Sequence, residues 1–165
     1  MPPFLNTMEK IRKTLDKIVD VVVVILFIVI FAVVLLQIFF RYVLNSPLVW
    51  SEELSRYLFI WISFLGWTLA TRHKTHIRVE FVLNALPKKV QFIVKVITHL
   101  IVIFFIGMLI YLGMRMALRS VDVPTVSLFF TYAYIYAIVP VASAIILFYT
   151  ILDFIDLFRK EEISR

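Results

Sequence analysis

Ionisable side chains that could do chemistry flank one apolar run in this sequence. Glu52, Glu53 and Arg56 come just before the uncharged stretch from Tyr57 to Thr71, and a charged stretch from Arg72 to Glu80 follows it. Ionisable groups close to a membrane-like segment are costly and often functional. These groups could form a site that handles an ion. Alternatively, an acid and a base one helical turn apart could pair and hold the helix at the membrane surface. The pattern therefore raises two interpretations, an ion site and a docked helix.

The histidines and the remaining motifs give little support to catalysis. Apart from tyrosines and residues at run ends, His99 is the only titratable residue inside an uncharged run, and one histidine makes no relay. We expect it to form a hydrogen bond with a neighbouring helix or to lie at the headgroup level. His73 and His76 lie in a basic connection, so they do not predict a haem site. With no cysteine and no HExxH, phosphate-loop or GxSxG pattern, the sequence predicts no catalytic residue, cofactor or metal.

The elements that position these residues are expected to be membrane helices. Hydrophobic residues make up 62% of the 165 residues and charged residues 17%, whereas a typical soluble domain is about half apolar and a quarter charged. The apolar residues form four runs that leave little material for a soluble domain. Residues 1–165 are therefore expected to form a single membrane domain, and no nucleic-acid partner is expected.

Four spans follow from the lengths of these runs, because about 20 apolar residues cross a hydrocarbon core of roughly 30 Å. We predict an all-α integral membrane protein, a tilted bundle of four transmembrane helices at about residues 21–41, 51–71, 92–114 and 129–152. Pro124 is expected to open an interfacial segment before the last span, and Pro140 to kink that span.

The first twenty residues predict an amphipathic helix at the membrane surface or against a partner. Apolar residues recur there at spacings of four and three, while three lysines fall elsewhere around the helix. The alternative is that residues 1–20 simply prolong the first span into solvent.

The distribution of basic residues predicts the orientation. Thirteen Lys and Arg residues lie in the two terminal segments and the second connection, against four in the other two connections. Basic residues accumulate on the cytoplasmic side, so both termini are expected to be cytoplasmic.

Local chemistry around the second span can be predicted in more detail. Glu52 and Arg56 have the i, i+4 spacing of a helical ion pair, and Ser51 could cap the helix. Tryptophans such as Trp50 and Trp61 suit an interfacial belt or a partner surface. Gly66 begins a small-xxx-small step that permits close helix contact.

Several motifs in this region together resemble the small membrane subunit of tripartite ATP-independent periplasmic (TRAP) transporters. The residues that carry the resemblance are Trp50-Ser-Glu-Glu53, Arg56-Tyr-Leu-Phe-Ile-Trp61, Phe64-Leu-Gly66 and Arg72-x-x-x-His76-Ile-x-Val79, followed by an acid and later by Pro87. The acid is Glu80, where the family pattern leads us to expect Asp. The charge is kept. The order and spacing of these motifs match the family pattern closely over about forty residues. The length of the chain and its expected four spans extend the resemblance to the whole sequence.

The resemblance implies a multi-pass protein of the bacterial or archaeal cytoplasmic (inner) membrane. Its partners would be membrane lipids, a large multi-helix TRAP membrane subunit that handles sodium ions, and a periplasmic substrate-binding protein that delivers an organic acid. By analogy, this chain would brace the large subunit as a scaffold in an elevator-like cycle and would not transport by itself. Residues expected in partner contact or membrane anchoring are Trp50, Glu52, Glu53, Arg56, Trp61, Gly66, Arg72, His76 and Glu80.

Two other functions remain as alternatives. A free-standing four-helix channel or small transporter would conduct or transport unaided, although the sequence shows no inverted repeat or broken helix. A membrane enzyme would need a convergent acid, base, nucleophile or metal set. The transported substrate is left open among C4-dicarboxylates, sialic acid and other sugar acids.

Overall fold

The computed structural model describes residues 3–72 and 87–163, which are mainly helical, as expected. The chain divides into two compact units. The first unit contains α1, α2 as far as Leu69, and the segment Pro124–Phe130, and the second contains α4, α5 and α6. Each unit is described by itself. The predicted surface segment Val79–Leu86, which includes Glu80, lies outside the described residues, as does His76.

Helix α1 runs without interruption from Pro3 to Tyr42. The sequence predicts a separate amphipathic helix at residues 1–20, whereas in the structure residues 3–20 form the first half of the same helix. The reason is that the boundary region contains neither glycine nor proline, so nothing breaks the backbone hydrogen-bond ladder. The position of this first half at the membrane surface remains a prediction.

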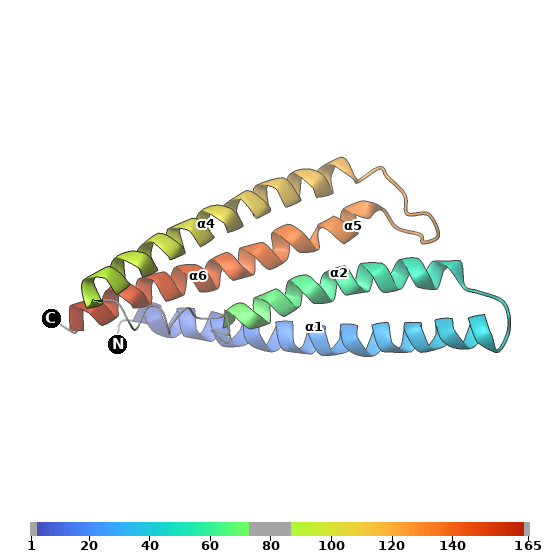
Figure 1. The fold of residues 1–165 in the computed structure, drawn as a ribbon, viewed down its shortest axis with the longest axis horizontal. Coiled ribbons are helices and arrows are strands. Elements are labelled where there is room, and N and C mark those ends of the chain that lie inside the picture. Colours follow the sequence, from blue (N-terminus) through green and yellow to red (C-terminus); the bar gives the residue numbers. More distant parts are fainter. Residues whose placement is uncertain (1–2, 73–86, 164–165) are drawn as a thin grey trace. The chain divides into compact units, whose positions relative to one another are not determined.

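The chain reverses between α1 and α2, which spans Val49–Arg72 and runs antiparallel to α1 (Figure 1). Asn45 has a left-handed backbone with φ 49°, a conformation that asparagine tolerates better than most residues. Ser46 N–H then donates to the carbonyl of Phe40 at 3.1 Å. This turn places the end of α1 beside the start of α2.

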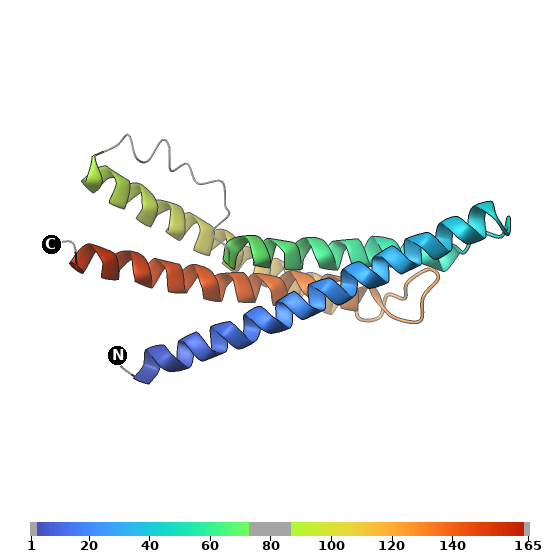
Figure 2. The same cartoon turned by 90° about the horizontal axis from the view of Figure 1, so that it is seen from below.

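The second unit is built on two antiparallel helices, α4 (Lys88–Arg119) and α6 (Ile138–Ile163), which pack along each other (Figure 2). The short helix α5 (Tyr132–Tyr136) precedes α6 and is separated from it at Ala137. Pro140 explains this break, since it has no N–H to donate back to the preceding turn. The predicted irregularity at Pro140 is therefore present as an interrupted helix. Pro124 lies in a nonhelical connection that ends where α5 begins at Tyr132, and the last helix, α6, begins at Ile138.

Close packing between α4 and α6 depends on one glycine. A Cβ atom at Gly113 would lie 2.9 Å from Cγ1 of Val139 and 3.0 Å from Cδ of Pro140. Further along the pair, the His99 ring lies 5.8 Å from the ring of Phe154. The backbone of α6 can approach α4 at Gly113 because no side chain separates them.

Three of the described helices are long and apolar enough to cross a membrane. These segments are Arg12–Tyr42, Val90–Arg119 and Tyr132–Phe158. Helix α2 covers the predicted second span in length but is not among them, because charged residues occupy its first two turns and hydroxyl and tryptophan side chains dilute the remainder. The predicted all-helical class is confirmed, whereas the fourth span and the side on which the termini lie remain predictions.

Candidate functional site

Glu53 is the most extensively hydrogen-bonded acid at the start of α2. Its side chain is only 9% exposed. One carboxylate oxygen accepts the backbone N–H of Val126 at 3.0 Å, and the other accepts that of Ser127 at 2.7 Å. The hydroxyl of Tyr57, one helical turn further on, also donates to Glu53. All four residues belong to the first unit, so Glu53 ties α2 to the segment Pro124–Phe130.

The segment Pro124–Phe130, which we call the bracket loop, also has bonds of its own. Thr125 donates its N–H to the carbonyl of Phe130 at 3.0 Å, and its hydroxyl lies 2.8 Å from the carbonyls of Leu128 and Phe130. The ring of Phe130 meets the ring of Tyr57 edge to face, with centroids 6.2 Å apart. Internal bonds and the Glu53 carboxylate together define the conformation of this loop.

The neighbouring acid, Glu52, faces a different partner. It forms an ion pair with Arg41 at the end of α1, and the amide nitrogen of Gln37 lies 3.5 Å from the same oxygen. The sequence predicts a pair between Glu52 and Arg56, so the predicted partner is wrong. The antiparallel turn brings Arg41 to Glu52, whereas Arg56 is exposed. Both paired side chains are 47% exposed, and such pairs contribute about 0.2–1 kcal/mol in water.

Ser51 has a role other than the predicted cap. Because α2 begins at Val49, Ser51 lies inside the first turn, and its hydroxyl donates to the carbonyl of Leu48 at 2.7 Å. Ser55 in turn donates its hydroxyl to the carbonyl of Ser51 at 2.7 Å. The two serines are therefore donors to the backbone of α2, whereas an N-cap would accept from it.

The other predicted residues do not join this cluster of hydrogen bonds. Trp50 is exposed, Trp61 is half-buried, and Arg72 ends α2. At Gly66 an added Cβ would meet no atom of the described chain within 4 Å, so the predicted close contact is not made there. The contact in the described structure is made by Gly113 instead. Roles in partner contact remain predictions for the whole predicted set.

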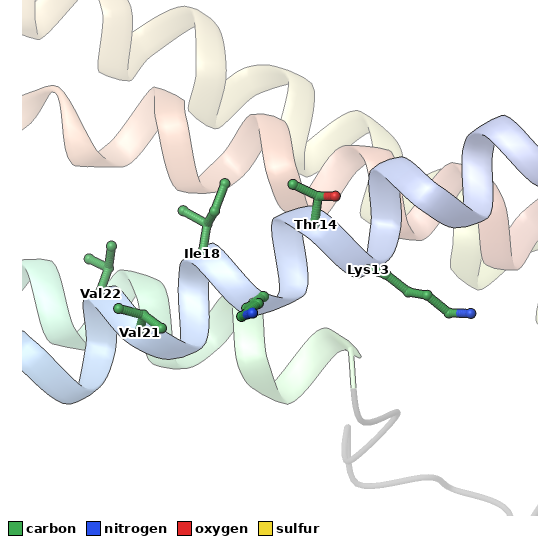
Figure 3. A pocket seen from close by; sticks show the side chains of 6 residues that line it. Lys13, Thr14, Ile18, Val21 and Val22 are labelled. Atoms are coloured by element: carbon green, nitrogen blue, oxygen red, sulfur yellow. The ribbon is translucent and has the colours of Figure 1, made fainter.

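An open depression lies on the N-terminal half of α1 (Figure 3). Two lysines, Lys13 and Lys17, line it together with Thr14 and three aliphatic residues of the same helix, Ile18, Val21 and Val22. This mixture of basic and apolar side chains is typical of a helix surface that meets lipid headgroups.

Within residues 3–72 and 87–163, no group of three His, Cys, Asp or Glu residues could hold a metal ion. His99 bonds to its own helix, with Nδ1 2.8 Å from the carbonyl of Lys95. Of the two expectations for His99, the bond to a neighbouring helix is not the one formed here, and the position at the headgroup level stays a prediction. The bond that is formed directs the Nδ1 proton to Lys95 and orients the ring against Phe154 of α6.

The comparison with known proteins decides the family. Residues 30–160 match the model of the DctQ component of tripartite ATP-independent periplasmic transporters. The chain belongs to this family of small TRAP membrane subunits. The matched range contains Arg41, Glu53, Tyr57 and the whole bracket loop, and the family predicted from the Trp50–Glu80 motifs is confirmed.

Individual relatives of this TRAP small subunit fall into two groups. The chain is similar to the sialic acid TRAP transporter small permease protein SiaQ of Vibrio cholerae, with 30% identity over 68% of this chain and 65% of SiaQ. It is also similar to a putative TRAP transporter small permease protein of Haemophilus influenzae, with 25% identity over 88% of this chain and 90% of the relative. The sialic acid TRAP transporter permease protein SiaT of H. influenzae is 36% identical over 49% of this chain, which spans only 13% of SiaT.

Sequence reasoning missed three participants in the site, namely Arg41, Tyr57 as a donor, and the bracket loop. The i, i+4 spacing of Glu53 and Tyr57 could have revealed the second. No sequence signal points from Glu53 to Val126 and Ser127, because backbone N–H groups carry no residue identity.

Proposed function

We propose that this TRAP small subunit acts as a scaffold for a large transport subunit and helps to dock a periplasmic substrate-binding protein. The transporter would be sodium-coupled and would take up an organic acid, with sodium and substrate handled by the large subunit. The chain itself would not transport. The observation that carries this proposal is the family match over residues 30–160.

Matches to much longer permease proteins support the pairing with a large subunit. The matched segments make up 13% of SiaT and 7% of the isethionate TRAP transporter permease protein DctMQ of Oleidesulfovibrio alaskensis. In those proteins a segment like this one is one part of a larger permease chain. A protein that supplies the same segment as a separate chain would need to bind the remainder non-covalently.

The exposed apolar surfaces of α1 and α4 support a scaffold role. Only 11% of the apolar part of α1 and 6% of that of α4 are buried, compared with 44% for the segment that contains α5 and α6. Phe31 and Phe104 are among the large side chains exposed on these two helices. In a membrane, such surfaces face lipid or another membrane protein, so they offer room for a large subunit.

The turn between α1 and α2 and the adjoining connection would provide the docking side. We assign residues 45–53 and 119–125 to the extracytoplasmic surface, following the excess of basic residues in the segments predicted to be cytoplasmic. Glu52 and Arg41 present an exposed acid and base in this region. Exposed charges affect the rate and register of protein association more than its strength.

The substrate we propose is an organic acid, with sialic acid as the first candidate. Two of the similar proteins, SiaQ and SiaT, are named for sialic acid, whereas DctMQ is named for isethionate. All three names specify small organic anions. Substrate contacts would lie mainly on the binding protein and the large subunit, so this chain would contribute little to the choice.

Affinity purification tests the pairing. We expect the tagged chain, co-expressed with a large TRAP membrane subunit from the same organism, to retain that subunit in mild detergent at a fixed ratio. An unrelated four-helix membrane protein carrying the same tag is the control. Recovery of the chain alone, from membranes that contain both proteins, would contradict the proposal.

A further inference from the structure

The bracket loop leaves two apolar side chains almost entirely exposed. Val126 is 86% exposed and Phe129 is 106% exposed, whereas Thr125 between the loop's internal bonds is buried. No ionisable residue occurs between Val123 and Phe130. We call Val126 and Phe129 the loop tip. Transfer of these two side chains from water to an apolar surrounding would be favourable.

The loop tip is fixed near the level at which the apolar span of α1 ends. The uncharged run of α1 stops before Arg41, and Arg41 pairs with Glu52 at the start of α2. The next residue, Glu53, binds the bracket loop through Val126 and Ser127. These contacts all belong to the first unit, so they place the bracket loop beside the membrane boundary of α1.

The backbone of the loop is suited to a medium with little water. An irregular segment in lipid is unfavourable because its polar groups lose their hydrogen bonds to water. Here the N–H groups of Thr125, Val126 and Ser127 are all bonded within the protein, as are the carbonyls of Leu128 and Phe130. These bonds offset part of the cost of removing the loop from water.

We propose that Val126 and Phe129 insert into the headgroup and upper acyl region of the bilayer, so that the loop held by Glu53 is a membrane anchor. A protein partner is less consistent with the tip, because a stable interface covers about 800 Å² on each side and one phenylalanine covers about 150–250 Å². The bilayer is the apolar medium already required by the three membrane-capable helices. The anchor would operate whatever the substrate of the transporter.

Site-specific fluorescence quenching tests the anchor. The chain has no cysteine, so Phe129→Cys gives a single site for an environment-sensitive fluorophore. Because the Phe129 side chain is fully exposed, its replacement removes no packing contact from the chain. The labelled chain is measured alone and with the large subunit in phosphatidylethanolamine and phosphatidylglycerol vesicles. Spin-labelled lipids and aqueous iodide are the two quenchers. Asp122→Cys, at an exposed acid in the same connection, is the matched control.

We expect spin-labelled lipid to quench the label at position 129 several-fold more than the label at 122, and iodide to show the reverse order. The same pattern should hold with and without the large subunit. Equal quenching of both positions by iodide would overturn the proposal. Protection of position 129 from both quenchers in the complex would also overturn it, and would identify a protein contact.

Discussion

Replacing Glu53 by alanine is expected to release the bracket loop while leaving the helices in place. The backbone N–H groups of Val126 and Ser127 would lose their shared acceptor, and Tyr57 would lose its partner. Hydrogen bonds to a charged group are stronger than neutral ones, so these two amides should exchange with deuterium about tenfold faster or more. Hydrogen exchange of the purified chain, resolved to the peptide that contains the loop, measures this change.

Two further variants make the interpretation specific. Glu53→Gln keeps one carbonyl oxygen as an acceptor and should give an intermediate exchange rate. Glu52→Ala removes the adjacent acid, whose bond is to Arg41 and not to the loop, so exchange at Val126 and Ser127 should stay unchanged. An equal increase in the Glu52 and Glu53 variants would show that the loop responds to general disturbance of α2 and would refute the assigned contact.

The second large effect is expected at Gly113, where α4 and α6 come closest. Gly113→Val would force side-chain carbon into Val139 and Pro140, which lie 2.9 and 3.0 Å from the position of the first added atom. Neither neighbour can move easily, because valine is restricted at χ1 and the proline ring is closed. Overpacking of this kind costs about 1–3 kcal/mol of folding free energy, measured by unfolding of the chain in detergent.

Gly107 supplies the matched control on the same helix. An added Cβ there would meet no described atom within 4 Å. Gly107→Ala should therefore leave the free energy of unfolding within about 1 kcal/mol, with a tendency to stabilise because alanine is the better helix former. Equal destabilisation by substitutions at both glycines would contradict a specific contact at Gly113.

Apolar runs and prolines in the sequence predicted the fold better than charge patterning did. Long uncharged runs predict helices well, because backbone groups in an apolar medium must bond within the segment. Near residue 20 the charge pattern changes while the backbone of α1 does not break, so the continuity of this helix could not be predicted from charge patterning. In contrast, the break at Ala137 could be predicted from Pro140, since the cause is a missing N–H donor.

The contacts of the candidate site could be predicted less well than the helices. Motifs around Glu52 and Glu53 were sufficient to predict the family, but spacing suggested Arg56 as the partner of Glu52. The actual partner, Arg41, depends on the turn at Asn45, which folds the end of α1 onto α2. Glu53 and Val126, which are hydrogen-bonded, are separated by 73 residues in the sequence. Such pairings require the tertiary fold, because local periodicity concerns only neighbours on one helix.

Substrate uptake into proteoliposomes tests most directly the central claim that this chain is an indispensable subunit without transport activity of its own. The large subunit, the binding protein loaded with its substrate, and an inward sodium gradient are supplied with or without this chain. We predict sodium-dependent uptake with all components, background uptake when this chain is omitted, and no flux when it is reconstituted alone. Full uptake by a stable complex that lacks this chain would contradict the account, as would transport by the chain unaided.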